Sequence, residues 1–302
     1  MSTQAPAARP RLAVGVVGTG RVGAVLGAAL AAVGHPVVAA SGVSAPSRER
    51  AEQLLPGVPL MAPDEVVQLA DLVLLTVPDD VLPPLVEGLA ATGSLRAGQL
   101  VAHMSGRHGV GVLEPVARAG AGPLALHPVM TFTGTSVDLA RLAGASFGVT
   151  APDVLRPVAE ALVLEMGAEP IWIEEQHRVL YHAALAHAAN HLVTLTSDAM
   201  DLLRVAGVER PGAMLGPLLG AALDNALRSG DAALTGPVAR GDAGTVAAHL
   251  DVIGRYAPDA VRAYVAMARR TADRAMASGR LKAADAEALL DVLADRADGR
   301  RS

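Results

Sequence analysis

Residues 13–32 read AVGVVGTGRVGAVLGAALAA, a short apolar run that passes through three spaced glycines into an alanine-rich stretch. In a GxGxxG turn between a strand and a helix, the first glycine permits the tight turn and the second lets a pyrophosphate approach the backbone. The third glycine lets the helix pack on the sheet, and the helix N-terminus attracts phosphate. The stretch therefore predicts a dinucleotide site lined by Gly18, Gly20, Arg21, Val22 and Gly23. A glycine-rich turn without a ligand is the alternative.

Short β-branched runs alternate with helical patterns from Arg11 to Ile173. The predicted strands span residues 13–18, 36–40, 71–77, 99–104, 123–127, 147–150 and 169–173. The predicted helices between them span residues 22–33, 47–55, 63–70, 80–91, 110–119 and 153–166. Such alternation is typical of βαβ units, so we expect an α/β domain with a Rossmann-type, mostly parallel sheet that helices cover on both faces.

Beyond residue 173 the pattern is helical throughout. The predicted helices span residues 175–206, 211–229, 243–256, 259–277 and 283–297. The expected fold is thus α/β plus all-α, with a Rossmann domain at 11–173 and a helical substrate and dimerisation domain at 174–302. We expect residues 1–10 to be disordered. The helical part has more apolar surface than one layer can bury, which predicts a homodimer.

Composition excludes several classes of function. The 302 residues include no cysteine, so disulfides, thiolate nucleophiles and cysteine-ligated metal centres are excluded. The net charge is −5 and six aromatic residues are present, which argues against nucleic-acid binding. The N-terminal segment lacks the apolar core of a secretory signal, and no apolar run is long enough for a membrane span. We expect a cytoplasmic protein with no membrane or nucleic-acid partner.

The end of the second predicted strand bears on the choice between NAD and NADP. An acidic residue there binds the ribose 2′-hydroxyl of NAD and repels the 2′-phosphate of NADP. Residues 37–47 contain no Asp or Glu, whereas Ser41, Ser44, Ser47 and Arg48 offer three hydroxyls and a cation. We therefore expect NADP, with NAD still possible. Alternatively, Arg48 belongs to a solvated helix face.

The third predicted strand runs into the residues TVPDD. Ligands of open α/β sheets bind beyond the carboxyl ends of the strands, so Val77, Pro78 and Asp79 are expected to border the cofactor. Asp79 or Asp80 is also a candidate N-cap of the next helix.

Two more predicted strands end in polar clusters. The first cluster contains His103, Ser105, Gly106 and His108, and the second begins at His127 in LHPVMTF. If both strands belong to the sheet, both clusters lie at its ligand-binding edge. A histidine at a strand end is also commonly a structural residue, so this alternative stays open for each one.

The motifs occur in the order GxGxxG, LLTVPDD, HMSG, LHPVMTF, LYHAALAHAAN and LTGPVARGD. In this order they resemble a family of Rossmann-like proteins whose helical C-terminal domain has no known function. That family is similar to the wider 6-phosphogluconate dehydrogenase-like group, which includes β-hydroxyacid dehydrogenases, ketopantoate reductases and pyrroline-carboxylate reductases. The resemblance covers residues 11–297 and implies a helical domain like that of the 6-phosphogluconate dehydrogenases.

The resemblance implies roles for several residues. In the best-known dehydrogenases of the group, the first long helix of the helical domain carries a catalytic Lys and, four residues later, a substrate-binding Asn. Asn190 matches the Asn, but Ala186 stands where the Lys would be. Ser105 and Gly106 resemble the start of a substrate-binding loop, although Arg107 replaces its second glycine. Arg240 is a further candidate for binding an anionic substrate, with an ion pair to Asp242 as the structural alternative.

Without the lysine, another group must move the proton. His182 lies about 80° around the predicted helix from Asn190, and an imidazole suits acid–base work near neutral pH. His127 is the second candidate. A zinc site at His187 and His191 is disfavoured, because the helix lacks the glutamate of the HExxH motif. These two histidines are expected to pack or face solvent, and no metal is predicted.

We therefore expect an NADP-dependent oxidoreductase that transfers a hydride to or from a small keto acid, alcohol or imine between its two domains, with a ketopantoate-type keto acid preferred. In this hypothesis Asn190 and Ser105 position the small-molecule substrate, and His182 or His127 handles the proton. The alternative is a non-catalytic NAD(P)-binding sensor or scaffold, which Ala186 favours.

Overall fold

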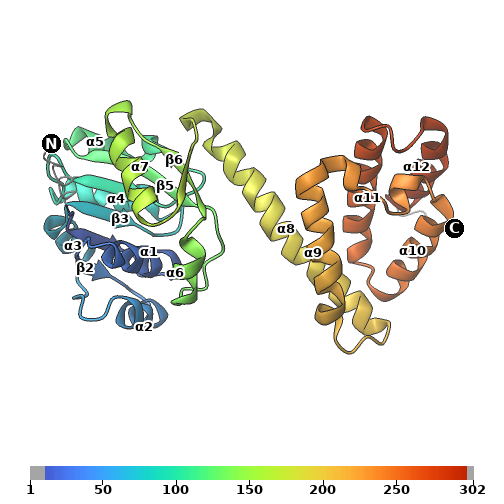
Figure 1. Cartoon of the computed structure of the whole chain (residues 1–302), viewed down its shortest axis with the longest axis horizontal. Helices are drawn as coiled ribbons and strands as arrows, with labels where there is room; N and C mark the ends of the chain where they lie inside the picture. The colour runs from blue at the N-terminus through green and yellow to red at the C-terminus, as the bar shows by residue number, and fades with distance from the viewer. Residues whose placement is uncertain (1–10, 298–302) are drawn as a thin grey trace, which may run out of the picture. The chain divides into compact units, whose positions relative to one another are not determined.

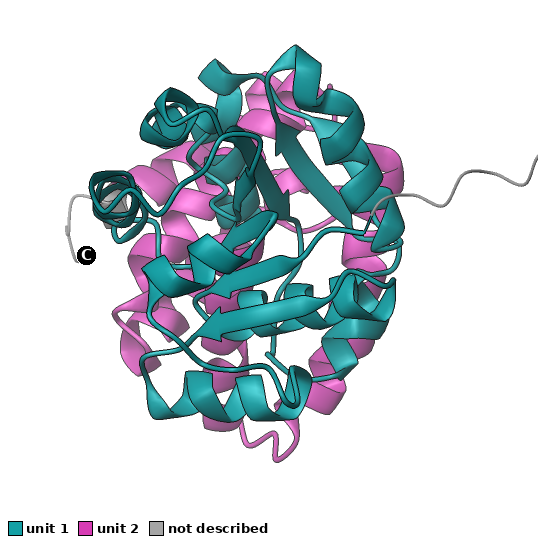
Figure 2. Cartoon of the chain, turned by 90° about the vertical axis from the view of Figure 1, so that its left-hand side faces the viewer, with its two compact units in different colours: residues 1–188 teal, residues 189–302 magenta. Residues whose placement is uncertain are grey.

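The computed structural model describes residues 11–297, which fall into two compact units divided between Ala188 and Ala189 (Figure 2). The division lies inside a long helix, and each unit is described below by itself. The domain boundary expected near residue 173 stays a prediction. The disorder expected for residues 1–10 concerns positions outside the described residues.

The first unit contains a seven-stranded sheet in the order β2-β1-β3-β4-β5-β6-β7 (Figure 1). The strands are β1 Val14–Val17, β2 Val37–Ser41, β3 Leu72–Leu75, β4 Leu100–His103, β5 Gly122–Pro128, β6 Ser146–Thr150 and β7 Glu169–Trp172. Strands β1 to β5 are parallel, whereas β6 pairs antiparallel with β5 and β7 pairs parallel with β6. The predicted strands and the Rossmann-type sheet are confirmed.

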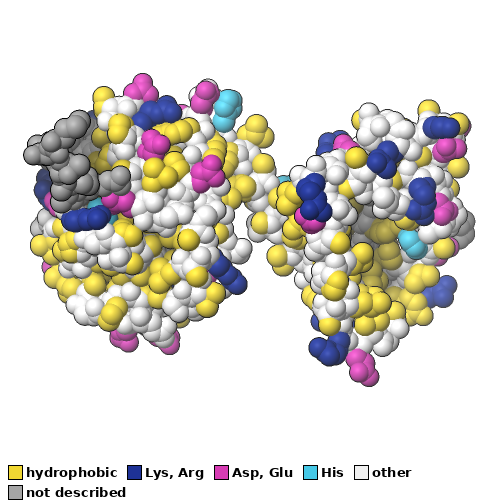
Figure 3. Space-filling model, in the orientation of Figure 1, with side chains coloured by type: hydrophobic (Ala, Val, Ile, Leu, Met, Phe, Trp, Pro, Cys, Tyr) yellow, Lys and Arg dark blue, Asp and Glu magenta, His cyan; other side chains and the backbone are white. Residues whose placement is uncertain are grey.

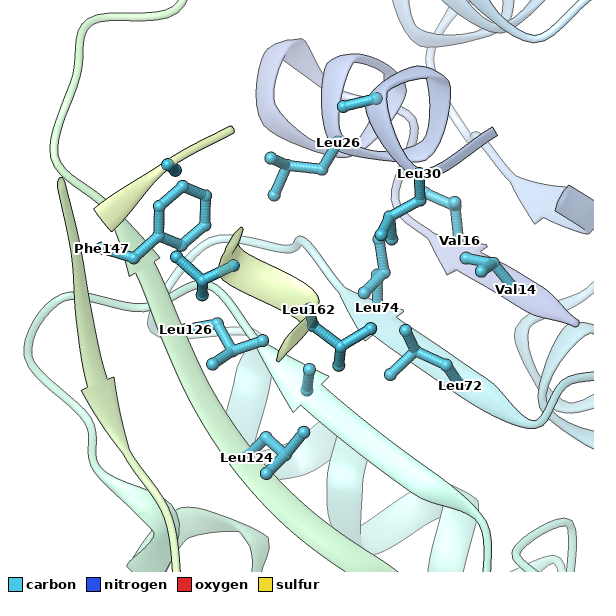
Figure 4. Packing of buried hydrophobic residues seen from close by; sticks show 14 of the residues in the cluster. Val14, Val16, Leu26, Leu30, Leu72, Leu74, Leu124, Leu126, Phe147 and Leu162 are labelled. Atoms are coloured by element: carbon cyan, nitrogen blue, oxygen red, sulfur yellow. The ribbon is translucent and has the colours of Figure 1, made fainter. Parts of the chain in front are cut away.

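Helices cover both faces of the sheet. They are α1 Arg21–Ala32, α2 Ala45–Leu54, α3 Pro63–Leu69, α4 Leu82–Ala91, α5 Glu114–Arg118, α6 Val137–Leu142 and α7 Arg156–Glu165. Short 3-10 turns precede three helices: η1 Val110–Leu113, η2 Asp153–Leu155 and η3 Glu175–His177. Leu26 of α1 and Leu162 of α7 pack with Leu74 and Phe147 on one face (Figure 4). Val66 of α3 and Val86 of α4 belong to a second core cluster, on the other face.

Two details of this unit differ from the sequence-based expectations. Helix α6 was not expected, and it forms because the buried carboxylate of Asp138 accepts backbone hydrogen bonds from Thr133 and Gly134 just before it. The expected N-cap at Asp79 or Asp80 is wrong. Helix α4 starts after Val81, and the amide of Val81 donates to the Pro78 carbonyl, so a backbone turn replaces the side-chain cap.

The described residues of the second unit form helices joined by loops, with no strand. Helix α8 (Arg178–Val205) continues into it from the first unit, and it is followed by α9 Pro211–Ser229, η4 Gly230–Ala233, η5 Val238–Arg240, α10 Ala243–Tyr256, α11 Ala260–Ala277 and α12 Ala283–Ala297. Val246, Val265 and Leu289 anchor the core between α10, α11 and α12. The predicted α/β plus all-α organisation is confirmed. In the described part of the chain, no helix combines the length and the apolar character that a membrane crossing needs.

The topology determines where the predicted site residues lie. Because β1 to β5 run parallel, the residues that follow their last positions emerge at one edge of the sheet. The glycine turn, the residues after Leu75, the loop after His103 and the end of β5 at Pro128 therefore share that edge, where open α/β sheets bind ligands.

Candidate functional site

The glycine turn after β1 is built around close contacts. Gly18 has φ 102°, and its amide donates to the Ser41 carbonyl at 3.0 Å. A Cβ at Gly23 would lie 2.1 Å from the Gly18 carbonyl and 2.2 Å from Thr76 Oγ1, so only glycine lets α1 cross this closely. A Cβ at Gly20 would meet nothing within 4 Å. Gly18 and Gly23 therefore shape the turn, while Gly20 leaves open space before α1 that fits a dinucleotide phosphate.

Arg21 and Val22 open α1 directly after this turn. Arg21 is exposed, and its side chain lies beside the loop that follows β5, where a Cβ at Gly134 would come 3.0 Å from Arg21 Cγ. Val22 is half-buried and packs against the sheet core. Arg21 is thus the accessible cation of the turn.

The hydroxyl groups of Ser44 and Ser47, after β2, form hydrogen bonds within their own turn. Ser47 is buried and its Oγ donates to the Ser44 carbonyl at 2.8 Å, while the Ser44 hydroxyl caps α2. Ser41 is buried at the end of β2. Arg48 is exposed and donates to the Val43 carbonyl at 2.7 Å. Arg48 is therefore the predicted specificity residue with the most accessible charge.

The turn after β3 lies close to the next strand ends. Val77 and Asp79 are half-buried and Pro78 is exposed. The carboxylate of Asp79 raises the pKa of both His103 and His127, against the stronger lowering effect of burial on each. The negative charge of Asp79 thus acts on the histidines that end β4 and β5.

His103 has a structural role at the end of β4. The ring is fully buried, its Nδ1 accepts from the Ser105 amide at 3.2 Å, and its Nε2 lies 2.8 Å from the Gly109 carbonyl. Burial lowers its pKa to about 4, opposed by the Gly109 hydrogen bond. A neutral ring with its proton on Nε2 satisfies both contacts. The buried Ser105 hydroxyl also accepts from the His108 amide at 3.2 Å, so His103 and Ser105 shape the loop after β4.

His127, Tyr181 and His182 meet beside Gly106. The Tyr181 hydroxyl lies 2.8 Å from His127 Nδ1. The His182 ring meets the His127 ring edge-on, with 5.9 Å between centroids and 83° between planes. A Cβ at Gly106 would lie 2.5 Å from His182 Cδ2 and 2.9 Å from His127 Nε2. The end of β5, the loop after β4 and the start of α8 thus converge on one polar cluster within the first unit.

Arg178, in the first turn of α8, bonds to the backbone of the segments that form this cluster. Its guanidinium is buried and donates to the carbonyl oxygens of Ser105, His108 and Gly148, each at 2.8 to 2.9 Å. Its Cζ lies 5.7 Å from the centre of the Tyr181 ring. Within residues 11–297 it forms no ion pair. Burial lowers the pKa of Arg178, whereas the nearby Tyr181 and Glu175 raise it, so a partly offset positive charge lies next to the cluster.

Burial controls the protonation of His127. It lowers the pKa of His127 to about 4, and the positive charge of Arg178 and the nearby His182 lower it further. His127 is therefore neutral near pH 7. The His182 ring is half-buried, and across the described residues its nitrogens make no hydrogen bond, which leaves them available to a ligand.

The other predicted substrate residues belong to the second unit. Asn190 on α8 and Arg240 on η5 are exposed. Among the described residues, Arg240 and Asp242 form no direct ion pair, although the charge of Arg240 helps to lower the pKa of Asp242, after the larger effect of the hydrogen bonds from Thr245. Arg240 donates to the Thr235 carbonyl instead, and the Asp242 carboxylate caps α10 by accepting from the Thr245 amide at 3.1 Å. The cap forms because Asp242 directly precedes the helix.

Three further residues of α8 bear on the predicted chemistry, namely Ala186, His187 and His191. Ala186 replaces the expected lysine in the first unit, while His187 and His191 are exposed on either side of the unit boundary. Across residues 11–297, no group of His, Asp and Glu side chains is arranged to hold a metal ion.

Tyr181 and Arg178 were not among the residues predicted from sequence. Tyr181 precedes His182 in the same motif and is one of three tyrosines in the chain, which is a usable signal. No comparable signal in the sequence marks Arg178, because its hydrogen bonds join residues that are 30 to 73 positions apart.

Family comparisons agree with this architecture. Residues 2–128 match the family model of the Rossmann-like domain, and residues 145–271 match that of a domain of unknown function, DUF2520. The chain is a Rossmann-like protein with a DUF2520 domain. The predicted family resemblance is thereby confirmed. A search of curated protein sequences returns no match.

Solved structures share the fold at low sequence identity. A candidate NADP oxidoreductase of Bacteroides fragilis is 20% identical, with a TM-score of 0.73 over 87% of this chain and 98% of its own. The NADP⁺ complex of an imine reductase from Myxococcus stipitatus is 16% identical, with a TM-score of 0.65 over 86% and 94% of the two chains. Plasmodium falciparum pyrroline carboxylate reductase, solved with NADP bound, is 12% identical, with a TM-score of 0.56 over 87% and 98%.

Proposed function

We propose that this protein is an NAD(P)-dependent oxidoreductase, with NADP favoured, that transfers a hydride to or from a small keto acid, alcohol or imine. One observation carries the proposal: the open space at Gly20 and the cluster of His127, Tyr181 and His182 lie at the same edge of one sheet. A dinucleotide at the first feature and a substrate at the second suit hydride chemistry.

The residues of the first unit fit a bound dinucleotide. Gly18, Gly20 and Gly23 would receive the pyrophosphate at the start of α1, and Arg48 would favour a 2′-phosphate. When bound, the nicotinamide supplies or accepts the hydride. His127 and His182 would contact the substrate, and the buried loop at Ser105 would hold Gly106 beneath them.

Imines and keto acids are the preferred substrate classes. A ketopantoate-type keto acid follows from the sequence resemblance. The imine is supported by relatives of the same fold that are described as imine and pyrroline carboxylate reductases. We keep Asn190 and Arg240 as proposed substrate residues, since an amide and a guanidinium suit a carboxylate.

We also propose a homodimer formed through the second unit. Large apolar side chains on α8 and α9 are exposed, among them Val193 at 67%, Leu218 at 64% and Leu227 at 79%. Hydrophobic side chains are visible on the surface of this unit (Figure 3). Exposed apolar surface of this kind marks interaction sites. A cytoplasmic location stays a prediction.

The test measures oxidation of NADPH and of NADH with a panel of 2-keto acids, cyclic imines and aldehydes. We expect turnover with NADPH, and a loss of kcat without a loss of NADPH binding in His127→Gln. Arg118→Gln, at an exposed position of α5, is the matched control and should behave as the wild type. Tight NADPH binding with no turnover on any substrate would favour the sensor or scaffold, and no binding of either dinucleotide would refute both hypotheses.

A further inference from the structure

We propose that Tyr181 is a positioning and relay residue, which replenishes through His127 the proton that the substrate receives. The inference rests on the proposed reductase function, because a carbonyl or imine that gains a hydride must also gain a proton at oxygen or nitrogen. It answers a question that the missing lysine at Ala186 leaves open, namely which group delivers that proton.

The contact between Tyr181 and His127 is made inside the fold. The hydroxyl of Tyr181 lies 2.8 Å from His127 Nδ1, and the two rings are perpendicular, with 5.6 Å between centroids. A Cβ at Gly148 would lie 2.3 Å from the same hydroxyl oxygen. The phenol therefore reaches His127 only because residue 148, which pairs with His127 across β5 and β6, is glycine.

The surroundings of the phenol determine that Tyr181 donates, and His127 accepts, in their hydrogen bond. The Gly148 amide, a donor, lowers the pKa of Tyr181 by hydrogen bonding to its oxygen, while the dominant effect of burial raises that pKa. Tyr181 is thus protonated near pH 7, and its proton is free to point at Nδ1. A neutral His127 that accepts at Nδ1 carries its own proton on Nε2.

Nε2 of His127 lies beside Gly106, on the opposite side of the ring from the contact between Nδ1 and Tyr181. The nearest atom of His127 to a Cβ built at Gly106 is Nε2, and the ring of His182 borders the same position. A substrate atom that approaches Nε2 of His127 would therefore meet a donor, while Tyr181 contacts Nδ1 on the other side of the ring. This arrangement separates the group that touches the substrate from the group that supplies the proton.

The proposed step balances within these groups. The Nε2–H bond of His127 breaks as an O–H or N–H bond forms on the substrate. The O–H bond of Tyr181 breaks as an Nδ1–H bond forms, so the imidazole stays neutral throughout. The starting state returns when Nε2 takes a proton from water and the Nδ1 proton goes back to the phenolate. The positive charge of Arg178, 5.7 Å from the ring centre, and the Gly148 amide both stabilise that phenolate.

The charged and titratable groups around His127 favour this route over a cationic imidazolium. Arg178 and His182 on α8 disfavour a positive ring, and Asp79 after β3 opposes them more weakly. With a pKa of about 4, almost no imidazolium exists near pH 7, so His127 needs Tyr181 to act as an acid there.

Tyr181→Phe tests the relay by its pH profile. The variant keeps the ring and removes the proton, so at pH 7 we expect kcat to fall by roughly 10-fold to 100-fold with KM little changed. Toward pH 4.5 the loss should shrink, since protonated His127 then donates directly. Tyr264→Phe is the matched control, because the Tyr264 hydroxyl makes the same kind of contact, to His249 Nδ1 at 2.9 Å, within the second unit. An unchanged kcat or a pH-independent loss in Tyr181→Phe would overturn the relay.

A second readout does not depend on turnover. Nitrogen-15 NMR of histidine-labelled protein reports which ring nitrogen carries the proton, and we expect His127 to be the Nε2–H tautomer in the wild type at pH 7. In Tyr181→Phe the Nδ1 resonance should shift toward that of a nitrogen without a hydrogen-bond donor. An Nδ1–H tautomer in the wild type would refute the relay even if the enzyme reduces imines. The expected tautomer in a protein without turnover would refute the reductase function alone.

Discussion

Arg178 Nη2 donates to the carbonyl oxygen of Ser105 at 2.9 Å and so fastens the first turn of α8 to the loop after β4. The same guanidinium bonds the carbonyls of His108 and Gly148. Arg178→Gln would leave at least one buried carbonyl without its donor. We expect the free energy of unfolding of the first unit to fall by about 2 to 4 kcal/mol, measured by urea denaturation.

The control for this prediction is Arg118→Gln. Arg118 is exposed and pairs with Glu114 one helical turn away, so its loss should cost less than about 0.5 kcal/mol. Equal effects of the two substitutions would mean that the buried contacts of Arg178 do not stabilise the unit.

Substitutions of Gly20 and Gly23 in the same turn should differ in their effect on stability. Gly23→Ala would press a methyl group against Thr76 Oγ1, 2.2 Å away, so we expect loss of stability together with loss of NADPH binding. Gly20→Ala meets no protein atom within 4 Å, so thermal stability should be unchanged while NADPH affinity falls at least about tenfold. Calorimetry and thermal melts separate the two effects. Normal NADPH affinity in Gly20→Ala would place the cofactor elsewhere.

His103 makes the stability of the first unit sensitive to acid. Its pKa is lowered to about 4 by burial, against about 6.5 in an unfolded chain. Below pH 6.5 the unfolded chain binds a proton that the folded chain does not, so stability is complete above that pH and is lost as the pH falls toward 4. We expect His103→Gln to reduce the slope of unfolding free energy by about 1.4 kcal/mol per pH unit in this window. An unchanged slope would mean that His103 titrates normally.

Arg48 tests the preference for NADP. Its exposed guanidinium is an accessible cation just after β2. The Ser47 hydroxyl is less available to a ligand, because it already donates to the Ser44 carbonyl. In Arg48→Ala we expect the Kd for NADPH to rise about tenfold and the Kd for NADH to stay constant, because only NADPH carries the 2′-phosphate. Ser47→Ala should change the ratio of the two Kd values less. Equal weakening of both dinucleotides would assign Arg48 to a general role.

The layout of the first unit could be predicted because its signals are local. Each of the seven strands is a β-branched or apolar run bounded by turn residues, and the GxGxxG turn fixes the first strand–helix crossing. Helix α6 escaped prediction because its formation depends on a buried Asp138 that binds Thr133 and Gly134, rather than on hydrophobic periodicity. The reversal of β6 and β7 relative to β5 likewise depends on non-local pairing.

The candidate site was less accessible to sequence reasoning. The sequence led to His127 and His182 because polar residues at strand ends and on an apolar helix stand out. In the sequence, their partner Tyr181 looks like an ordinary core aromatic. Only the structure shows that Gly148, which lacks a side chain, leaves room for its hydroxyl. Pairings over long separations, such as His127 with Tyr181 54 residues later, leave no local pattern.

The loop that carries Arg240 offers a test of the second unit alone. Gly241 has φ 71°, and a Cβ there would lie 2.8 Å from the Asp285 carbonyl at the start of α12. Gly241→Ala should therefore destabilise the packing of α10 against α12 by about 1 to 3 kcal/mol, seen as faster hydrogen exchange in both helices. Gly244→Ala, three residues later in α10, meets nothing within 4 Å and should be neutral or stabilising. If both variants exchange like the wild type, the Arg240 loop is not anchored by this contact, and Arg240 loses the rigid support that a substrate-binding residue requires.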